Sequence, residues 1–316
     1  MRIGIDLGGS HIGIGLVLEG NILEIREKVF TQQDKKDIKK AIIENTISII
    51  DEILLAQNID KKEIELIGIA SPGLISGGSI VKASNLSIFD FNICEEIEKM
   101  TGIKTQLRND AKCAAICEKE YGALKEYTDC IFLSLGTGIG GAAFIDGKLL
   151  EPNGFSGFEF GHMVIEKDGI LCTCGKKGCF ERYCSIKALK NRITEALHIS
   201  NDVSGKYLRE EILNRTDKEI DEEIDEWIDY LRIGLGNLID IFEPKAICFG
   251  GSFAHYEDTK IMKKLKERMK EPNTTFTTSK SPDIVVAKYQ NSAGIIGATL
   301  TISKKNELFN LDNKKY

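Results

Sequence analysis

The feature that most restricts the fold of this sequence is a pattern that occurs twice: an apolar strand, a glycine-rich turn and a second apolar strand. In residues 2–18 two apolar runs flank Gly8-Gly9-Ser10, and residues 22–30 can return as a third strand. Later, an apolar run at 128–135 leads into a turn at Gly136–Gly141, and 142–145 follow as its partner. Because helices and strands alternate after each unit, we predict two related α/β domains with a cleft between them.

Apolar periodicity outside these units predicts the remaining elements. Short apolar runs predict strands at 66–70, 246–249 and 284–287, and spacing near 3.6 predicts helices at 35–57, 110–122, 217–242, 258–270 and from about 292. Only five Pro occur, and no low-complexity linker interrupts the chain, so ordered helices should join the domains. We expect a small α/β domain of residues 1–118 plus about 292–316, and a large α/β domain of residues 119–291.

A cluster of possible metal ligands lies inside the expected large domain. His162 is followed by nine residues and then by Cys172, Cys174 and Cys179, which is a full donor set for a closed tetrahedral zinc site. Gly175 and Gly178 let the short loop fold back so that three thiolates can converge. The alternative is four unrelated residues, since five more Cys lie elsewhere. Two carboxylates, Glu159 and Glu181, bracket the cluster.

Three glycine-rich turns each follow an expected strand and predict a phosphate site. Backbone N–H groups in such turns can approach an anion without a Cβ in the way, although one such turn alone usually only reverses the chain. Neither a P-loop nor a G-x-G-x-x-G fingerprint fits. Asp6, at the end of the first strand, can face a phosphate-bound magnesium ion through water, or it can simply cap the turn. The residues of the turns are Gly8, Gly9, Ser10, Gly136, Thr137, Gly138, Gly250, Gly251 and Ser252.

Asn109 and Asp110 precede a helix-prone run of small residues. One interpretation of Asp110 is an ordinary helix N-cap. A carboxylate at a helix N-terminus also stays ionised near neutral pH, so Asp110 could instead accept a hydroxyl proton, with Asn109 bonding beside it.

The composition limits the partners and the compartment. The net charge of −6 and the lack of a basic stripe argue against nucleic acid as a partner. No signal-peptide core and no run of about 18 apolar residues occur, so we expect no membrane segment. Nine Cys without a secretory signal indicate a reducing cytoplasm.

The motifs, taken in order, resemble the ROK family of bacterial sugar kinases and sugar-responsive repressors, from Met1 to about Thr301. The metal-loop combination is specific to the family, whereas the glycine motifs occur throughout the wider actin/hexokinase group. The matching segments are D-L-G-G-S-H-I (6–12), N-D-A (109–111), G-T-G-I-G-G (136–141), E-F-G-H (159–162), C-x-C-G-x-x-G-C-x-E (172–181), E-P-K-A-I-C-F-G-G-S (243–252) and A-G-I-I-G-A (293–298).

The resemblance implies an actin/hexokinase-like (ribonuclease H-like) two-domain fold that binds ATP and a sugar in the cleft, as a homodimer or homotetramer. Asp110 would be the base that deprotonates a sugar 6-hydroxyl. Asn109, Glu159, His162 and Glu181 would bind the other hydroxyls. The first two turns would hold the phosphates, and Gly250 and Gly251 would lie against the adenosine. A structural Zn²⁺ bound by His162, Cys172, Cys174 and Cys179 would fix the orientation of the imidazole ring.

The resemblance leaves the substrate open. Glucose is the first choice, because a carboxylate at Glu159 suits free hydroxyls at C1 and C2; allose and N-acetylmannosamine or N-acetylglucosamine are alternatives. A sugar-responsive repressor without catalysis is the rival class, but the first strand begins at Arg2 and leaves no room for a DNA-binding module. Three positions depart from the family pattern: His11 replaces a frequent Lys, Phe158 replaces the usual Gly before Glu159, and Ile186 stands where a Gly commonly follows the Ser.

Overall fold

The computed structural model describes residues 1–151, 158–215, 217–271 and 281–301. Its N-terminal half is built on a mixed sheet in which β1 pairs antiparallel with β2 and parallel with β4. Glycines let α9 (Ala293–Ala298), the last helix among the described residues, lie directly on this sheet, because a Cβ on Gly4 would come within 2.1 Å of the Ile295 carbonyl oxygen. The strand order is β3-β2-β1-β4-β8, with β1 Arg2–Leu7, β2 His11–Leu18, β3 Asn21–Val29, β4 Leu66–Ser71 and β8 Thr105–Asn109.

A second sheet repeats this arrangement in the C-terminal half. Here β9 pairs antiparallel with β10 and parallel with β12. The predicted repeat of strand, turn and strand is therefore confirmed. The strand order is β11-β10-β9-β12-β13, with β9 Cys130–Leu135, β10 Ile139–Ile145, β11 Lys148–Leu149, β12 Ala246–Gly250 and β13 Asp283–Val286.

The turn predicted at Gly136–Gly141 is shorter than expected, because β10 already begins at Ile139. Gly140 and Gly141 are strand residues, and packing explains why they are glycines. A Cβ on Gly140 would lie 2.8 Å from the Ala111 Cβ, and one on Gly141 would lie 2.5 Å from the Phe160 ring.

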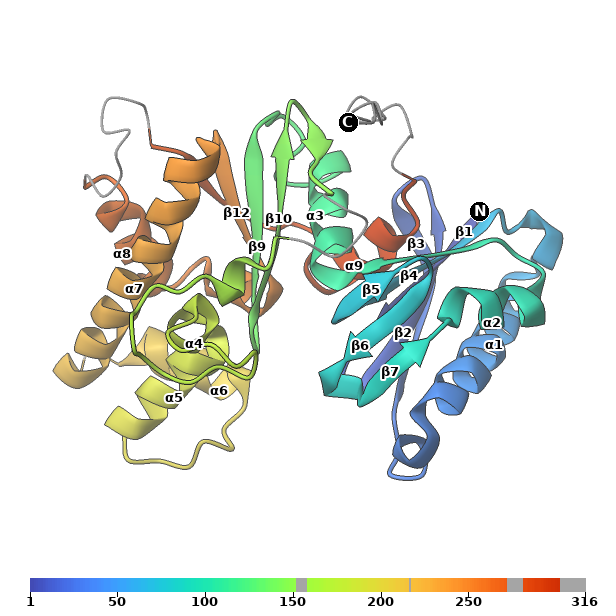
Figure 1. Ribbon diagram of the computed structural model, residues 1–316, viewed down its shortest axis with the longest axis horizontal. Coiled ribbons are helices and arrows are strands. Elements are labelled where there is room, and N and C mark those ends of the chain that lie inside the picture. Colours follow the sequence, from blue (N-terminus) through green and yellow to red (C-terminus); the bar gives the residue numbers. More distant parts are fainter. Residues whose placement is uncertain (152–157, 216, 272–280, 302–316) are drawn as a thin grey trace, which may run out of the picture.

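Helices α3 and α9 lie between the two halves, as Figure 1 shows. They approach closely, because a Cβ on Gly297 of α9 would come within 1.8 Å of the Cys113 carbonyl oxygen on α3. The prediction that ordered helices join the domains agrees with this arrangement. The helices are α1 Ile38–Gln57, α2 Ile93–Thr101, α3 Asp110–Glu120, α4 Phe180–Cys184, α5 Ile186–Ala196, α6 Gly205–Asn214, α7 Lys218–Phe242, α8 Lys260–Arg268 and α9 Ala293–Ala298.

A small antiparallel sheet after β4 was not predicted from the sequence. Its order is β5-β6-β7, with β5 Leu74–Ser76, β6 Ser79–Ala83 and β7 Ile88–Phe91. Strand β8, helix α2 and the run α4 to α6 were not predicted either. Short 3₁₀ turns complete the path at Asp34–Asp37, Lys61–Glu63, Ser84–Leu86, Phe160–His162, Gly251–Tyr256 and Gln290–Ser292.

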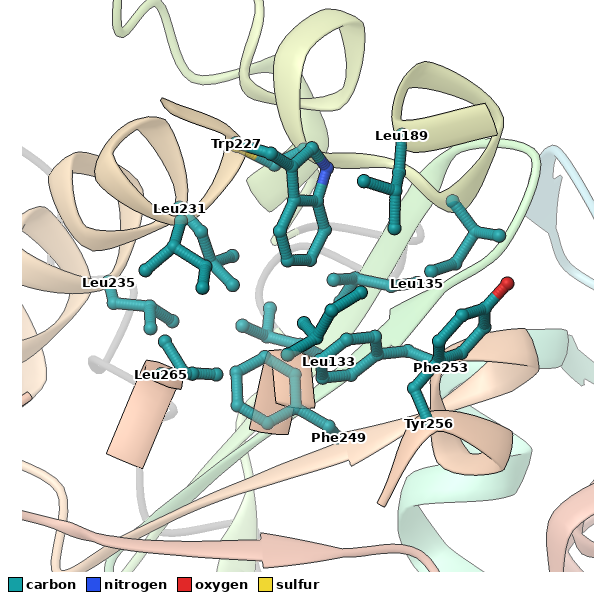
Figure 2. Packing of buried hydrophobic residues seen from close by; sticks show 14 of the residues in the cluster. Leu133, Leu135, Leu189, Trp227, Leu231, Leu235, Phe249, Phe253, Tyr256 and Leu265 are labelled. Carbon is teal, nitrogen blue, oxygen red and sulfur yellow. The ribbon is translucent and has the colours of Figure 1, made fainter. Parts of the chain in front are cut away.

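Each half has its own apolar core. In the C-terminal half, Trp227 of α7 packs against Phe253 with ring centroids 5.6 Å apart, and Phe249 of β12 lies on the other side of Phe253 (Figure 2). Each fully buried side chain of this size contributes about 1.5–3 kcal/mol. The N-terminal core is a separate cluster that includes Ile3, Ile5 and Ile67. Within the described residues, no helix is long and apolar enough to cross a membrane.

Candidate functional site

The parallel strands of the N-terminal sheet place Asp6 and Asp110 at the same edge. Asp6 is next to last in β1 and pairs with Ala70 of β4, while Ser71 pairs with Asn109, the last residue of β8. Asp110 follows as the first residue of α3. Because carboxyl ends of parallel strands meet at one edge, two positions that are distant in the sequence come together, and the charge of Asp110 acts on Asp6.

Asn109, and not Asp110, caps helix α3. The Asn109 Oδ1 accepts a hydrogen bond from the Lys112 backbone N–H at 3.3 Å. Asp110 Oδ1 accepts from the neighbouring Ala111 N–H at 2.8 Å. The N-cap interpretation of Asp110 is therefore wrong.

Both carboxyl groups are harder to ionise than the sequence suggested. Burial raises the pKa of Asp110 above its ordinary value, and the backbone N–H groups of Asp110 and Ala111 oppose this shift only in part. The helix terminus therefore favours the ionised form of Asp110 as expected, but desolvation outweighs its N–H groups and leaves the pKa above the ordinary value. Burial, followed by the charges of Asp110 and Glu27, raises the pKa of Asp6 to about 7.

The first glycine turn is closed by the backbone and covered by a side chain. The Gly8 N–H donates to the His11 carbonyl at 2.9 Å. A Cβ on Gly8 would lie 2.8 Å from the His11 Cε1, so the imidazole lies against the turn. Asn85, from the turn that follows β6, approaches Gly9 from the other side.

The second and third glycine turns lie side by side, because β9 and β12 are parallel neighbours. Gly251 has a φ of +65°, and a Cβ there would lie 2.8 Å from the Leu135 carbonyl oxygen and the Ser134 Oγ. Gly250 is the last residue of β12 rather than part of the turn. A Cβ on Gly250 would lie 2.4 Å from the Phe132 ring, so close packing inside the sheet already requires glycine there.

The predicted zinc ligands converge. The ligand atoms of His162, Cys172, Cys174 and Cys179 all lie within 4.8 Å of one another. The Cys174 and Cys179 sulfurs are 3.5 Å apart, and Cys172 Sγ lies 3.7 Å from His162 Nδ1. Zinc–sulfur and zinc–nitrogen bonds of about 2.3 and 2.0–2.1 Å in a tetrahedron put such atoms roughly 3.6–3.8 Å apart, so the residues fit Zn²⁺.

Backbone contacts close the loop of residues 162–179, which carries the predicted zinc ligands and which we call the metal loop. Val164 and Cys179 form a β-bridge, which brings the His162 segment against the last cysteine. Gly178 has a φ of +75°, and a Cβ there would come within 1.7 Å of the Glu166 carbonyl oxygen. Tyr183 Oη accepts the Ile170 N–H at 2.8 Å and ties the loop to α4.

Two of the predicted sugar-binding residues line one cavity. Glu159 and His162 face residues of the small sheet across a space of about 350 Å³, which we call the sugar cavity. Since His162 Nδ1 points at the thiols, its Nε2 is the ring nitrogen left for a ligand. The other residues of this cavity are Pro72, Gly73, Leu74, Lys82, Ala83, Ser84 and Asn85.

Glu181 lies beside the sugar cavity rather than in it. Its Oε1 is 3.2 Å from Cys172 Sγ and 3.7 Å from His162 Nδ1. Its Oε2 would lie 2.6 Å from a Cβ on Gly138, so the carboxylate joins the metal loop to the second glycine turn.

Phe158 adopts a backbone conformation that suits glycine. Its φ is +54°, in the left-handed region. The side chain offsets this strain by packing against Phe160 and Phe242, with ring centroids 5.7 and 6.0 Å away. The departure from the family pattern thus retains a glycine-like backbone.

Sequence reasoning missed the residues that the small sheet contributes, although Gly77-Gly78 between two short apolar runs is a hairpin signal. It also missed Lys112, which is only 3% exposed although it is a lysine. The Lys112 ammonium lies 3.9 Å from Glu151 Oε1, and its charge acts on Glu159. Only the folded chain reveals this buried cation near the sugar cavity.

A larger cavity of about 790 Å³, the base cavity, adjoins the third glycine turn. Helix α6 and the 3₁₀ turn after β12 form most of its wall. Its residues are Ile186, Gly205, Lys206, Arg209, Ser252, Ala254, His255, Tyr256, Glu257, Asp258 and Gln290.

Comparisons with known proteins agree with this geometry. A glucokinase of Thermotoga maritima is 28% identical over 323 residues, which cover 96% of this chain and 97% of that protein. A xylose repressor of Bacillus spizizenii is 32% identical over 255 residues, 79% of this chain and 64% of the repressor. The structure of a ROK family glucokinase from Streptomyces griseus, in complex with glucose and AMPPNP, matches with a TM-score of 0.78 at 25% identity, over 94% of this chain and 97% of that one.

The predicted actin/hexokinase-like, two-domain α/β fold is confirmed by these structural matches. The model of the ROK family matches residues 2–305, nearly the whole chain. This chain belongs to the ROK family.

Proposed function

We propose that this protein is an ATP-dependent hexose kinase that transfers the γ-phosphate of ATP to the 6-hydroxyl of a sugar, with glucose as the first candidate. The observation that carries the proposal is Asp110, a carboxylate of raised pKa that directly follows β8 and whose charge acts on Glu159, a residue of the sugar cavity. A base needs a pKa near the working pH, and burial moves this carboxyl in that direction. The glucokinases among its relatives support the same reaction.

In this proposal the protein's own residues bind, orient and deprotonate the sugar. Asp110 accepts the proton of the attacking hydroxyl, and Asn109 and Glu159 bond neighbouring hydroxyls. His162 offers Nε2 to the sugar because its Nδ1 is directed at the thiols. Glu181 accepts a hydrogen bond from a further sugar hydroxyl where the sugar cavity meets the second turn. Phosphoryl transfer mainly requires positioning and charge neutralisation, so one aspartate suffices as the base.

The nucleotide would occupy the base cavity and the turns. Gly250 and Gly251 would lie along the adenosine, and Gly8, Gly9, Ser10, Gly136, Thr137 and Gly138 would surround the phosphates. Asp6 would hold Mg²⁺ through water; a buried carboxyl with a pKa of about 7 suits a divalent cation, which favours its ionised form. Bound Mg²⁺ would neutralise charge on the transferred phosphate.

His162, Cys172, Cys174 and Cys179 would hold a structural Zn²⁺, as their mutual distances allow. The ion would fix the imidazole and join the loop to α4, which carries Glu181. We further propose the domain division 1–118 plus 292–316 against 119–291, and assembly as a homodimer or homotetramer.

A second candidate is a sugar-responsive repressor-type protein that binds sugar without catalysis, which the 32% identity to a xylose repressor favours. Within the kinase class, allose, N-acetylmannosamine and N-acetylglucosamine are alternative substrates.

The test is ADP release from Mg-ATP with zinc-loaded protein and glucose, allose, mannose, fructose, N-acetylglucosamine or N-acetylmannosamine, with the phosphorylated carbon identified by NMR. We expect one preferred sugar and a 6-phosphate product. Asp110→Asn should lose most turnover while still binding sugar, whereas Glu120→Gln, exposed on the same helix, should behave as wild type. Sugar binding without turnover in the wild type would favour the repressor-type protein.

A further inference from the structure

Among the described elements, the chain passes between the two five-stranded sheets twice, and each connection contains a helix. The first connection runs from β8 through α3 to β9, and the second runs from β13 to α9 (Figure 1). The two helices rest on different sheets. Ile116 of α3 belongs to the same apolar cluster as Phe132 of β9, whereas Ile295 of α9 lies against Gly4 of β1. The contacts between the two connections therefore decide how the two sheets face each other.

Glu118, in the last turn of α3, is a carboxylate that the proposed chemistry does not use. The residue is fully buried. Its Oε2 accepts a hydrogen bond from the Ala123 N–H at 2.8 Å, and its Oε1 accepts one from the Tyr289 N–H at 2.7 Å. Ala123 lies between α3 and β9, and Tyr289 lies between β13 and α9. One carboxylate thus binds the backbone of both connections.

Local helix preferences do not explain a carboxylate at this place. A negative charge in the last turn of a helix lies at the negative end of the helix dipole, and a buried charge is costly unless it is hydrogen-bonded. The two backbone N–H groups supply these hydrogen bonds. Gly122 leaves room for them, because a Cβ there would come within 1.9 Å of Glu118 Oε2. Tertiary contacts, and not the helix, therefore stabilise Glu118.

Both connections lead from Glu118 to the acids of the candidate site. Asp110 is the first residue of α3, eight residues before Glu118 and so about 12 Å away along the helix. Tyr289 is the N-cap of the 3₁₀ turn that precedes α9. In α9, a Cβ on Gly294 would lie 3.0 Å from the carboxylate of Asp6. Glu118 thus joins the helix that carries Asp110 to the helix that lies against Asp6.

We propose that Glu118 is a positioning residue, which fixes α3 relative to α9 and thereby holds Asp110 and Asp6 in place for phosphoryl transfer. Glu118 lines neither the sugar cavity nor the base cavity. Its effect on turnover rests on the proposed function, whereas its hold on the two connections does not. Displacing a catalytic group by about 1 Å can lower the rate about a hundredfold, so a residue outside the site can control turnover.

The first test is hydrogen–deuterium exchange of the zinc-loaded full chain without sugar or nucleotide. Glutamine at position 118 offers one acceptor oxygen, and its NH₂ group would face the other N–H. Glu118→Gln should therefore speed exchange at least tenfold in residues 289–298 and 110–113. Gly122→Ala, which keeps the charge but displaces the carboxylate, should give the same pattern.

Two controls separate this effect from a general loss of stability. Glu120→Gln, exposed on the same helix, should exchange as wild type. Ile53→Val, in the core beside α1, lowers the stability of the fold without a change at either connection. Any faster exchange in Ile53→Val should be spread over the chain and not confined to residues 289–298 and 110–113.

The second test separates turnover from sugar binding. With Mg-ATP and saturating glucose, kcat of Glu118→Gln should fall at least tenfold. The calorimetric Kd for glucose should stay within about twofold of wild type, because Glu159 and His162 of the sugar cavity lie on neither connection. Ile53→Val should keep the kcat of wild type.

The proposal is overturned if Glu118→Gln and Gly122→Ala both exchange as slowly as wild type, because Glu118 then does not hold the connections. It is also overturned if exchange rises while kcat stays at the wild-type value, because the role is then structural alone. A wild type without turnover would instead contradict the proposed function, and the exchange measurement would still show whether Glu118 holds α3 and α9 together.

Discussion

Replacing Asp6 with Asn should stabilise the protein, and increasingly so as the pH rises. The Asp6 pKa rises from 3.8 to about 7 on folding, through burial and the charges of Asp110 and Glu27. The folded state therefore binds its proton more tightly than the unfolded state, so stability is lost as pH rises from the unfolded value to the folded one. At 1.36 kcal/mol per pH unit, the cost is about 1.5 kcal/mol at pH 5 and about 4 kcal/mol at pH 8, as an upper limit.

Urea unfolding of Asp6→Asn and wild type at pH 5 to 8, without Mg²⁺ and with equal zinc, measures this cost. Zinc contributes equally to both proteins and cancels in the difference. Asp51→Asn, on the exposed face of α1, is the matched control and should change stability by less than about 0.5 kcal/mol at every pH. Saturating Mg-nucleotide should reduce or reverse the variant's gain in stability, because the metal favours the ionised carboxylate of the wild type. A difference that stays constant between pH 5 and pH 8 would refute the reasoning.

Three further outcomes are expected. Turnover should rise with pH as Asp110 ionises, because burial raises its pKa and only the carboxylate accepts a proton; a flat kcat profile would exclude it as the base. Cys174→Ser should lower zinc content and sugar affinity together, since its sulfur lies 3.5 Å from Cys179; metal analysis showing full occupancy would disprove the ligand set. Gly178→Ala should destabilise the metal loop by roughly 1–3 kcal/mol, because of its φ of +75° and the Glu166 carbonyl, whereas Gly147→Ala, with similar φ but open space, should cost less in thermal melts.

Local patterns in the sequence were enough to predict the repeated unit and the cluster of one His and three Cys. Strand, glycine turn and strand are neighbours along the chain, so the pairing of β1 with β2 and of β9 with β10 follows from sequence order. The cysteine spacing likewise confines three sulfurs to one short loop. The structure brings these sulfurs and His162 together as predicted.

Features that depend on distant packing could not be predicted in this way. The pKa of Asp110 depends on how completely the surrounding residues exclude water, which the residue's place at a helix start does not reveal. Lys112 looks like a surface lysine in a helix, yet it is buried beside Glu151. The strands of the small sheet are three to five residues long, so they contain too few positions for an alternation of apolar and polar residues to be recognised in the sequence.

Three residues that cost stability lie where the proposed chemistry takes place. Asp6 and Asp110 repel one another in a partly buried setting, and Phe158 holds a left-handed backbone immediately before Glu159. Each of these costs stability, on the order of 1–4 kcal/mol. Two separate apolar cores on either side of the cleft offset that cost. If the carboxylates served only the fold, asparagines would serve it better, which agrees with the proposal that the site uses their charge.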